Sequence, residues 1–189
     1  MTWGLPAASA VATRTTVRVA WLSCLLAAVL AGCATPAPAP GEAPWTAGRL
    51  SLRVDATPER AKQSLGVAFE VRGTGEQGEL RLTSPIGTQL AAARWARGVA
   101  VLRTPEGERS FSSLDELSRE ALGEALPLAA LPDWLNGRPW TAATHTVRSD
   151  GFDQLGWRVQ TNRLAEGWIS ARRDSPPAIE LRARLDRGD

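Results

Sequence analysis

The sequence predicts a mainly β fold of the α+β class, in which a short helical insertion interrupts a meandering antiparallel sheet. Three observations predict it. Apolar and polar residues alternate with a period of two in segment after segment, as in strands that bury one face. Turn signals separate these segments at intervals of about 8–12 residues, which is typical of consecutive antiparallel strands. Between residues 113 and 137 the apolar period becomes helical, and the alternation then returns.

Six strands are predicted before the insertion. Leu50 and Leu52 alternate with polar neighbours, and the same pattern recurs around Phe69 until the glycine-rich turn at residues 72–75. The predicted strands cover residues 50–54, 65–71, 79–83, 89–95, 99–103 and 108–111.

Two short helices are predicted within the insertion at residues 113–137. Ser113 and Glu116 have the spacing of a capping box, and Leu114 and Leu117 lie on one face of the helix that follows. Gly123 is expected to end this helix.

The second helix is predicted to begin at Pro127, a residue suited to the first helical turn. Leu131 and Trp134 lie on its apolar face, while Pro132 predicts a kink or a division into two short turns. The strand pattern then returns in residues 155–160, 168–172 and 179–185. We therefore expect the helices to cover one face of a curved sheet.

The first 32 residues have the parts of a bacterial export signal. Arg14 and Arg18 provide positive charge, and the apolar run that follows is too short to span a bilayer comfortably. The run ends in Leu-Ala-Gly-Cys33, which resembles the lipobox, the motif in which bacterial lipoproteins are acylated on cysteine and cleaved before it. The alternative is an uncleaved N-terminal anchor helix. The predicted organisation is a signal peptide at 1–32, a Pro/Ala-rich tether at 33–44 and a folded domain at 45–189.

The composition excludes several classes of function. The two arginines of the signal segment account for the formal net charge of +2, and no basic cluster with interleaved aromatics predicts nucleic-acid binding. His145, the only histidine, lies in the polar run 141–150 and is interpreted as a solvated loop residue. No nucleotide-binding or hydrolase motif is present, so we expect no catalytic residues, no metal, no cofactor and no enzymatic activity.

Four segments carry a resemblance to a known family. They are Gly-Arg-Leu at 48–50, Leu-Thr-Ser-Pro-Ile-Gly-Thr at 82–88, the stretch from Trp95 to Gly107, and Leu-Pro-Leu…Asp-Trp-Leu-Asn-Gly at 126–137. In this order the chain resembles the LolB family of outer-membrane lipoproteins over most of residues 45–186. Ala34 stands where an acidic residue would favour the inner membrane in enterobacteria, and this agrees with an outer-membrane location.

The resemblance implies an unclosed antiparallel β-barrel with a helical lid over a hydrophobic cavity. It also implies a monomeric, non-catalytic protein that accepts acylated lipoproteins from the periplasmic carrier LolA. The monomer would insert them into the inner leaflet of the outer membrane, with that membrane's lipid as a partner. The residues expected to line the acyl cavity are Leu50, Leu52, Phe69, Leu114, Leu117, Leu131 and Trp134. Six of the eight tryptophans lie beyond residue 33, which suits either a wide cavity or an ordinary core.

Pro85, Ile86 and Gly87 form the candidate membrane-insertion loop. Turns normally present polar side chains, yet Ile86 is apolar and β-branched. In the family an apolar residue at this turn protrudes and promotes membrane insertion. We favour protrusion over the alternative, in which Ile86 folds back onto the sheet.

A second function remains open at this point. A non-transporting envelope lipoprotein that scaffolds a protein assembly would have the same anchor and the same fold class. A dry apolar cavity would distinguish the two, because a scaffold would fill that space with its own side chains.

Overall fold

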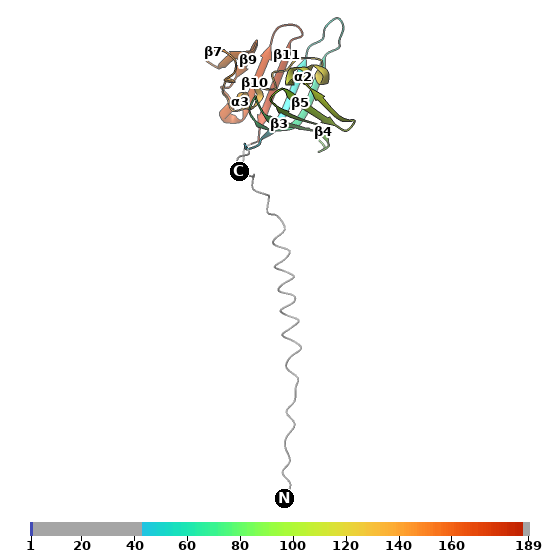
Figure 1. Ribbon diagram of the computed structural model, residues 1–189. Helices are drawn as coiled ribbons and strands as arrows, with labels where there is room; N and C mark the ends of the chain where they lie inside the picture. Colours follow the sequence, from blue (N-terminus) through green and yellow to red (C-terminus); the bar gives the residue numbers. More distant parts are fainter. Residues whose placement is uncertain (2–42, 187–189) are drawn as a thin grey trace. The chain divides into compact units, whose positions relative to one another are not determined.

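Eleven strands form one antiparallel sheet in the computed structural model, which describes Met1 and residues 43–186 (Figure 1). The first six strands are β1 (Thr46–Val54), β2 (Gln63–Gly73), β3 (Gly78–Thr83), β4 (Gln89–Ala96), β5 (Val99–Thr104) and β6 (Gly107–Phe111). Helices α2 (Leu114–Leu122) and α3 (Leu131–Leu135) follow. The last elements are β7 (His145–Arg148), β8 (Gly151–Gln154), β9 (Trp157–Gln160), the 3-10 turn η1 (Leu164–Glu166), β10 (Trp168–Arg173) and β11 (Ile179–Leu185). The predicted signal peptide and Cys33 lie outside the described residues.

The first and last strands pair in the middle of the sheet. The strand order is β6-β5-β4-β3-β2-β1-β11-β10-β9-β8-β7, and the register places Arg49 opposite Arg184. Within the described residues the edge strands β6 and β7 do not pair with each other, so the sheet is open. The predicted class, a mainly β fold with an antiparallel sheet and few helices, is confirmed.

One face of the sheet carries the core. Along β1, Leu52 is buried while Arg53 is exposed, because successive strand residues point to opposite faces. Leu117 of α2 and Trp134 of α3 belong to the same buried cluster as Leu52, so both helices pack on this inner face. Trp134 also meets the ring of Phe152 edge-on, with 6.4 Å between ring centroids.

The N-terminus of α2 has the predicted cap, with one difference. The Ser113 hydroxyl accepts a hydrogen bond from the Glu116 backbone N–H at 3.1 Å. The Glu116 carboxylate accepts from the backbone N–H of Ser112, at 2.8 Å, instead of from Ser113. Hydrogen bonds from Ser112 lower the pKa of Glu116. Gly123 ends the helix at a φ of 74°, as predicted.

Three predictions about the segment after α2 were wrong. The strand predicted at 155–160 begins at Trp157, because Leu155 and Gly156 form the turn that follows an unpredicted strand, β8. The second helix begins at Leu131 instead of Pro127, and residues 128–130 form a separate turn, which agrees with the division that Pro132 predicted. Residues 141–150 were interpreted as a loop, yet they contain all of β7, with His145 exposed at its start. All four residues of β7 are exposed, so no alternation of apolar and polar residues revealed the strand.

The start of the domain is fixed to the outer face of the sheet by Trp45. The guanidinium groups of Arg72 and Arg81 lie 4.5 and 4.3 Å from the centre of its ring. Both arginines also contact the buried carboxylate of Glu79, at 3.2 and 2.9 Å. Burial raises the pKa of Glu79, but hydrogen bonds from Arg81 and Arg72 outweigh it, so the pKa lies below its ordinary value.

Candidate functional site

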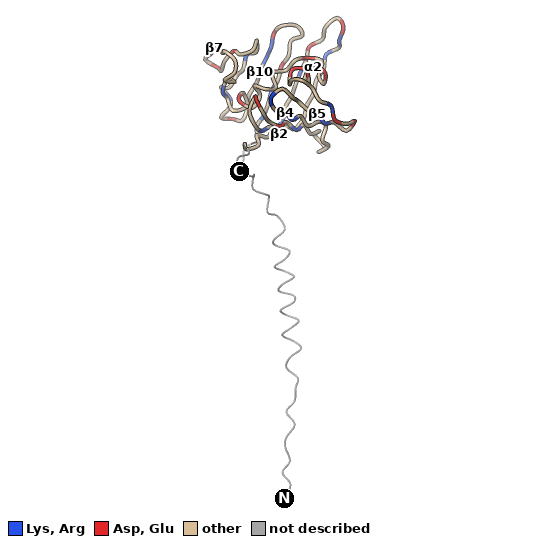
Figure 2. Tube along the Cα trace, in the orientation of Figure 1, with Lys and Arg blue, Asp and Glu red and all other residues tan. Residues whose placement is uncertain are grey.

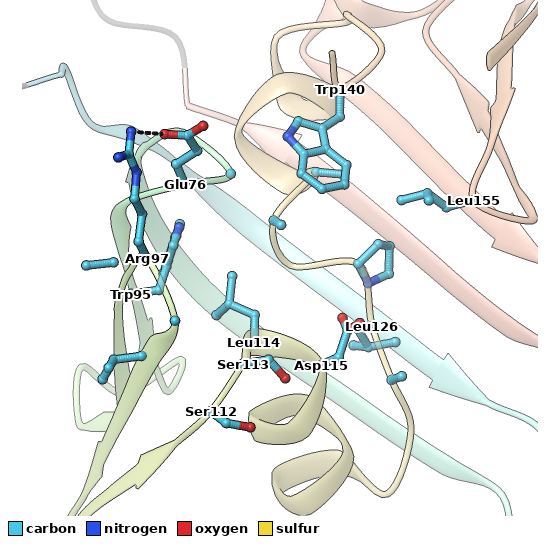
Figure 3. Close-up of a pocket in the computed structure, with 18 of the residues that line it drawn as sticks. Glu76, Trp95, Arg97, Ser112, Ser113, Leu114, Asp115, Leu126, Trp140 and Leu155 are labelled. Carbon is cyan, nitrogen blue, oxygen red and sulfur yellow. Dashed lines mark hydrogen bonds and ion pairs between the residues drawn. The ribbon is translucent and has the colours of Figure 1, made fainter. Parts of the chain in front are cut away.

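A cleft of about 670 Å³ opens between the β4–β5 hairpin, the start of α2 and the segment that links α2 to α3 (Figure 3). Trp95 and Arg97 lie on one side of it, and Trp140 and Leu155 lie on the other. Its apolar lining includes Trp95, Val99, Leu114, Leu126, Trp140 and Leu155, and its polar lining includes Glu76, Arg97, Ser112 and Asp115. A mostly apolar cleft of this volume is typical of sites that bind small apolar ligands.

The wall at Trp95 is held by β3 and the turn before it. The Trp95 indole N–H donates to the carbonyl of Thr74 at 2.8 Å. A Cβ at Gly78 would lie only 2.4 Å from the Trp95 ring, so glycine at this position leaves room for the indole beside β3. The orientation of this wall is therefore fixed before any ligand binds.

The opposite wall depends on the buried side chain of Gln154. Its amide oxygen accepts from the Trp134 indole N–H at 2.7 Å and from the Trp140 backbone N–H at 2.9 Å. Its amide nitrogen donates to the carbonyls of Trp140 and Ala143 at 2.8 and 2.9 Å. These four bonds use the whole capacity of the amide and fix the backbone around Trp140.

The segment that links the two helices forms a third wall of the cleft. The buried Ser118 hydroxyl accepts from the backbone N–H of Leu126 at 3.0 Å and so ties the segment to α2. Glu124 pairs with Arg173 at 2.9 Å and with Arg60 at 3.7 Å. These contacts hold Leu126 in the cleft through side chains that come from three different parts of the fold.

Leu155 has an unusual backbone conformation. It occupies the two-residue turn between β8 and β9 at a φ of 55°, followed by Gly156 at 79°. Both angles suit a type I′ turn, which favours asparagine or glycine at each position. A leucine there costs about 1 kcal/mol in backbone energy. Its side chain is 46% exposed and lines the cleft, so the strain places an apolar group at the cleft opening.

We expect Leu155→Asn to stabilise the protein by about 0.5–1 kcal/mol, because asparagine adopts this conformation with less strain. The same change should weaken binding of an environment-sensitive apolar dye to the cleft. Urea unfolding and dye titration measure the two effects. Val99→Asn is the matched control, because it removes an apolar group from the cleft without relieving strain and should affect only the dye. A destabilisation above about 1 kcal/mol in Leu155→Asn would identify Leu155 as a packing residue instead.

The structure distributes the predicted cavity residues among different environments. Leu114 lines the cleft, and Leu52 lines a smaller hollow of about 370 Å³ near Leu122. The other predicted residues are in the core or packed against it: Leu50, Phe69, Leu117, Leu131 and Trp134. Sequence reasoning missed the cleft residues Trp95, Val99, Leu126, Trp140 and Leu155. One signal was available for two of them, since Val99 and Leu155 are apolar residues adjacent to turn glycines.

Ile86 projects from a tightly bonded turn. Its side chain is 90% exposed. The Ser84 carbonyl accepts from the Gly87 N–H at 2.9 Å, and the Ser84 hydroxyl accepts from the Thr88 N–H at 3.0 Å. Gly87 takes a φ of 88°, which suits glycine. The loop of Pro85, Ile86 and Gly87 therefore presents an apolar side chain on a well-bonded turn.

Metal-binding clusters and membrane-spanning helices are both absent from the described residues. Within residues 43–186, no group of three or more histidine, cysteine or acidic side chains is placed to hold a metal ion. None of the helices in that region is long and apolar enough to cross a membrane.

Comparison with known proteins identifies the family. The family model described as outer membrane lipoprotein LolB matches residues 45–186. A protein of Bordetella parapertussis named outer-membrane lipoprotein LolB is 34% identical over 161 residues, covering 77% of this chain and 80% of its own. Proteins of the same name are 35% identical in Ralstonia nicotianae, covering 70% of each chain, and 34% identical in Dechloromonas aromatica, covering 86% and 87%. This chain, with its open antiparallel sheet and apolar cleft, belongs to the LolB family of outer-membrane lipoproteins.

Proposed function

We propose that this protein accepts acylated lipoproteins from the periplasmic carrier LolA and inserts them into the inner leaflet of the outer membrane. The observation that carries the proposal is the apolar cleft on the inner face of an open sheet, in a chain of the LolB family. The cleft holds the acyl chains of the cargo, and the segment from α2 to α3 acts as a lid over them. The protein works as a monomer, without cofactor or catalysis.

The energetics of transfer support a non-catalytic role. Burying an acyl chain of about 16 carbons is worth on the order of 12 kcal/mol, so a lipoprotein needs a carrier to cross water. No nucleotide-binding motif is present in the sequence, so each step must run downhill. The cleft must therefore bind acyl chains more tightly than the carrier does and less tightly than the bilayer. A cleft partly open to solvent, with charged Glu76 and Arg97 at its edge, suits this intermediate affinity.

The N-terminal segment supports an outer-membrane location and the way in which the protein is held there. Residues 1–32 direct export and are removed, Cys33 carries the lipid anchor, and residues 33–44 tether the domain to the periplasmic face of the outer membrane. This arrangement keeps the acceptor at the membrane into which the cargo is inserted.

A photoreactive residue at position 126 tests the proposal directly. We expect Leu126→benzoylphenylalanine to crosslink acylated lipoprotein in living cells, because Leu126 lines the cleft. The same replacement at Val147, which is 77% exposed on the edge strand β7, is the matched control and should give no such adduct. Equal crosslinking at position 126 to a cargo variant that lacks its acylated cysteine would contradict acyl binding. It would favour the scaffold alternative.

A further inference from the structure

Three residues form a row across the outer face of the central strands. Arg49 of β1 lies opposite Arg184 of β11, which in turn lies opposite Trp168 of β10. Both arginines are exposed and point away from the core. The Arg184 guanidinium lies 5.5 Å from the centre of the Trp168 ring, and the guanidinium of Arg163 lies 5.9 Å from it. We call Arg49, Arg184 and Trp168 the arginine face.

The positive charge of this face is not neutralised within the described part of the chain. Arg49 and Arg184 form no ion pair with any described carboxylate. Three acids near this face pair with other arginines: Glu70 with Arg81, Glu180 with Arg182 and Glu166 with Arg163. Asp186, two residues after Arg184, forms no ion pair with Arg49 or Arg184. Basic and acidic residues are interspersed over the domain (Figure 2), and most of its described arginines pair with a carboxylate, whereas Arg49 and Arg184 lie opposite each other without one.

The cross-strand placement of Arg49 opposite Arg184 lowers the stability of the fold unless an anion binds to both guanidinium groups. Like charges directly opposite each other on neighbouring strands are destabilising. A phosphate group removes the repulsion, because guanidinium groups bind phosphate oxygens through paired charge-assisted hydrogen bonds. Trp168 adds a side chain of the type that is enriched at the boundary between lipid and water.

The tether holds this face close to the membrane. Trp45 is fixed to the outer face of the sheet by Arg72 and Arg81, four residues before Arg49 on the same side of the chain. In the proposed function, a tether of residues 33–44 spans at most about 40 Å when fully extended, so Trp45 at the start of the domain stays within that reach of the lipid anchor. Confinement of this kind makes weak contacts effective, since they become intramolecular.

We propose that the arginine face docks on the anionic phospholipid headgroups of the membrane that holds the anchor. The proposal rests on the lipid anchor at Cys33 in the proposed function. The outer face lies on the opposite side of the sheet from the core and the cleft, so docking leaves the cleft free to receive cargo. The tether favours a lipid surface over an acidic protein as the occupant, because the membrane is always within reach.

The expected effect of removing the arginines is large. One arginine near an anionic membrane surface contributes about fivefold to binding, so Arg49→Gln with Arg184→Gln should reduce the ratio of docked to free protein about 25-fold. The interaction should weaken at high salt, because surface charges are screened over a few ångströms there.

Quenching of Trp168 by brominated phospholipid measures docking in the full lipidated protein. The protein is reconstituted in phosphatidylcholine vesicles with or without brominated phosphatidylglycerol, and Trp168→Phe gives the background from the other tryptophans. We expect salt-sensitive quenching in the wild type and its loss in the double variant. Arg109→Gln with Arg138→Gln is the matched control, because both residues are exposed and the change in charge is the same.

Three results would overturn the proposal. Salt-insensitive quenching that is equal with brominated phosphatidylcholine would show that no anionic headgroup is recognised. Unchanged quenching in the double variant would show that the two arginines do not contribute to docking. If the double variant also bound an acidic carrier more weakly, the arginine face would be a binding site for a protein instead. Cargo transfer into the same vesicles is measured in parallel. Failure of transfer in the wild type would contradict the proposed function, whereas failure of docking alone would leave transfer intact.

Discussion

Ile86→Glu is expected to accept cargo from the carrier at the normal rate but to deliver it to lipid about tenfold more slowly or worse. An isoleucine that enters the membrane interface gains about 1–2 kcal/mol of apolar burial, and a glutamate would instead lose hydration there. Because Ile86 is 90% exposed and lies on a turn outside the cleft, uptake and stability should not change. Transfer from carrier to variant and from variant to liposomes are measured separately.

The control for this experiment is Val147→Glu. Val147 is 77% exposed on the edge strand β7, so it undergoes the same chemical change at a site with no proposed membrane contact. Both steps should proceed normally in this variant. If Ile86→Glu lost the first step or unfolded at lower temperature, Ile86 would be a packing residue. Normal rates in both steps would remove it from the mechanism.

Gln154→Leu is expected to destabilise the protein by about 3–5 kcal/mol. The substitution leaves the Trp134 indole N–H, the Trp140 backbone N–H and two carbonyls without their partner. Each buried polar group that loses its hydrogen bond costs about 1–3 kcal/mol, and partial relaxation reduces the sum. The backbone around Trp140 should also lose its fixed position, so dye binding in the cleft should weaken. Urea denaturation and dye titration measure the two effects.

Gln160→Leu makes the same substitution on the neighbouring strand β9, where the side chain is exposed and bonds Asp150 and Ser170. We expect it to cost less than about 1 kcal/mol. A similar loss in both variants would mean that the change reflects strand position alone. It would then say nothing about the support of the cleft wall.

The sheet was largely predictable because its strands bury one face. Leu52 and Phe69 follow the alternation that places side chains in the core, and the capping residues Ser113 and Gly123 bound α2 as expected. The strand β7 was missed because it lies at an edge with every side chain exposed. β7 is a strand because its backbone is hydrogen-bonded to β8, and the pattern of apolar and polar residues gives no information about such bonds.

The cleft was harder to predict than the sheet. Periodicity identifies residues that face the core, and it therefore selected Leu117 and Trp134, which fill the core instead of lining an opening. Leu126, Trp140 and Leu155 reach the cleft from a linking segment and from turns, where no period applies. Side-chain hydrogen bonds of Ser118 with Leu126 and of Gln154 with Trp140 fix two of these positions, and the sequence alone does not reveal such bonds.

The pairing of the first and last strands also determines when the domain can fold. β1 gains its second neighbour only when β11 is available, as the pairing of Arg49 with Arg184 shows. Bringing β1 and β11 together restricts the long chain between them, and this loss of entropy comes before their contacts stabilise the fold. Proteins dominated by such non-local pairs therefore fold slowly. During synthesis the nascent chain therefore lacks the strand that completes the centre of its sheet. We expect the newly made chain to stay unfolded until nearly all of it has left the ribosome, a delay that would suit the export proposed for it.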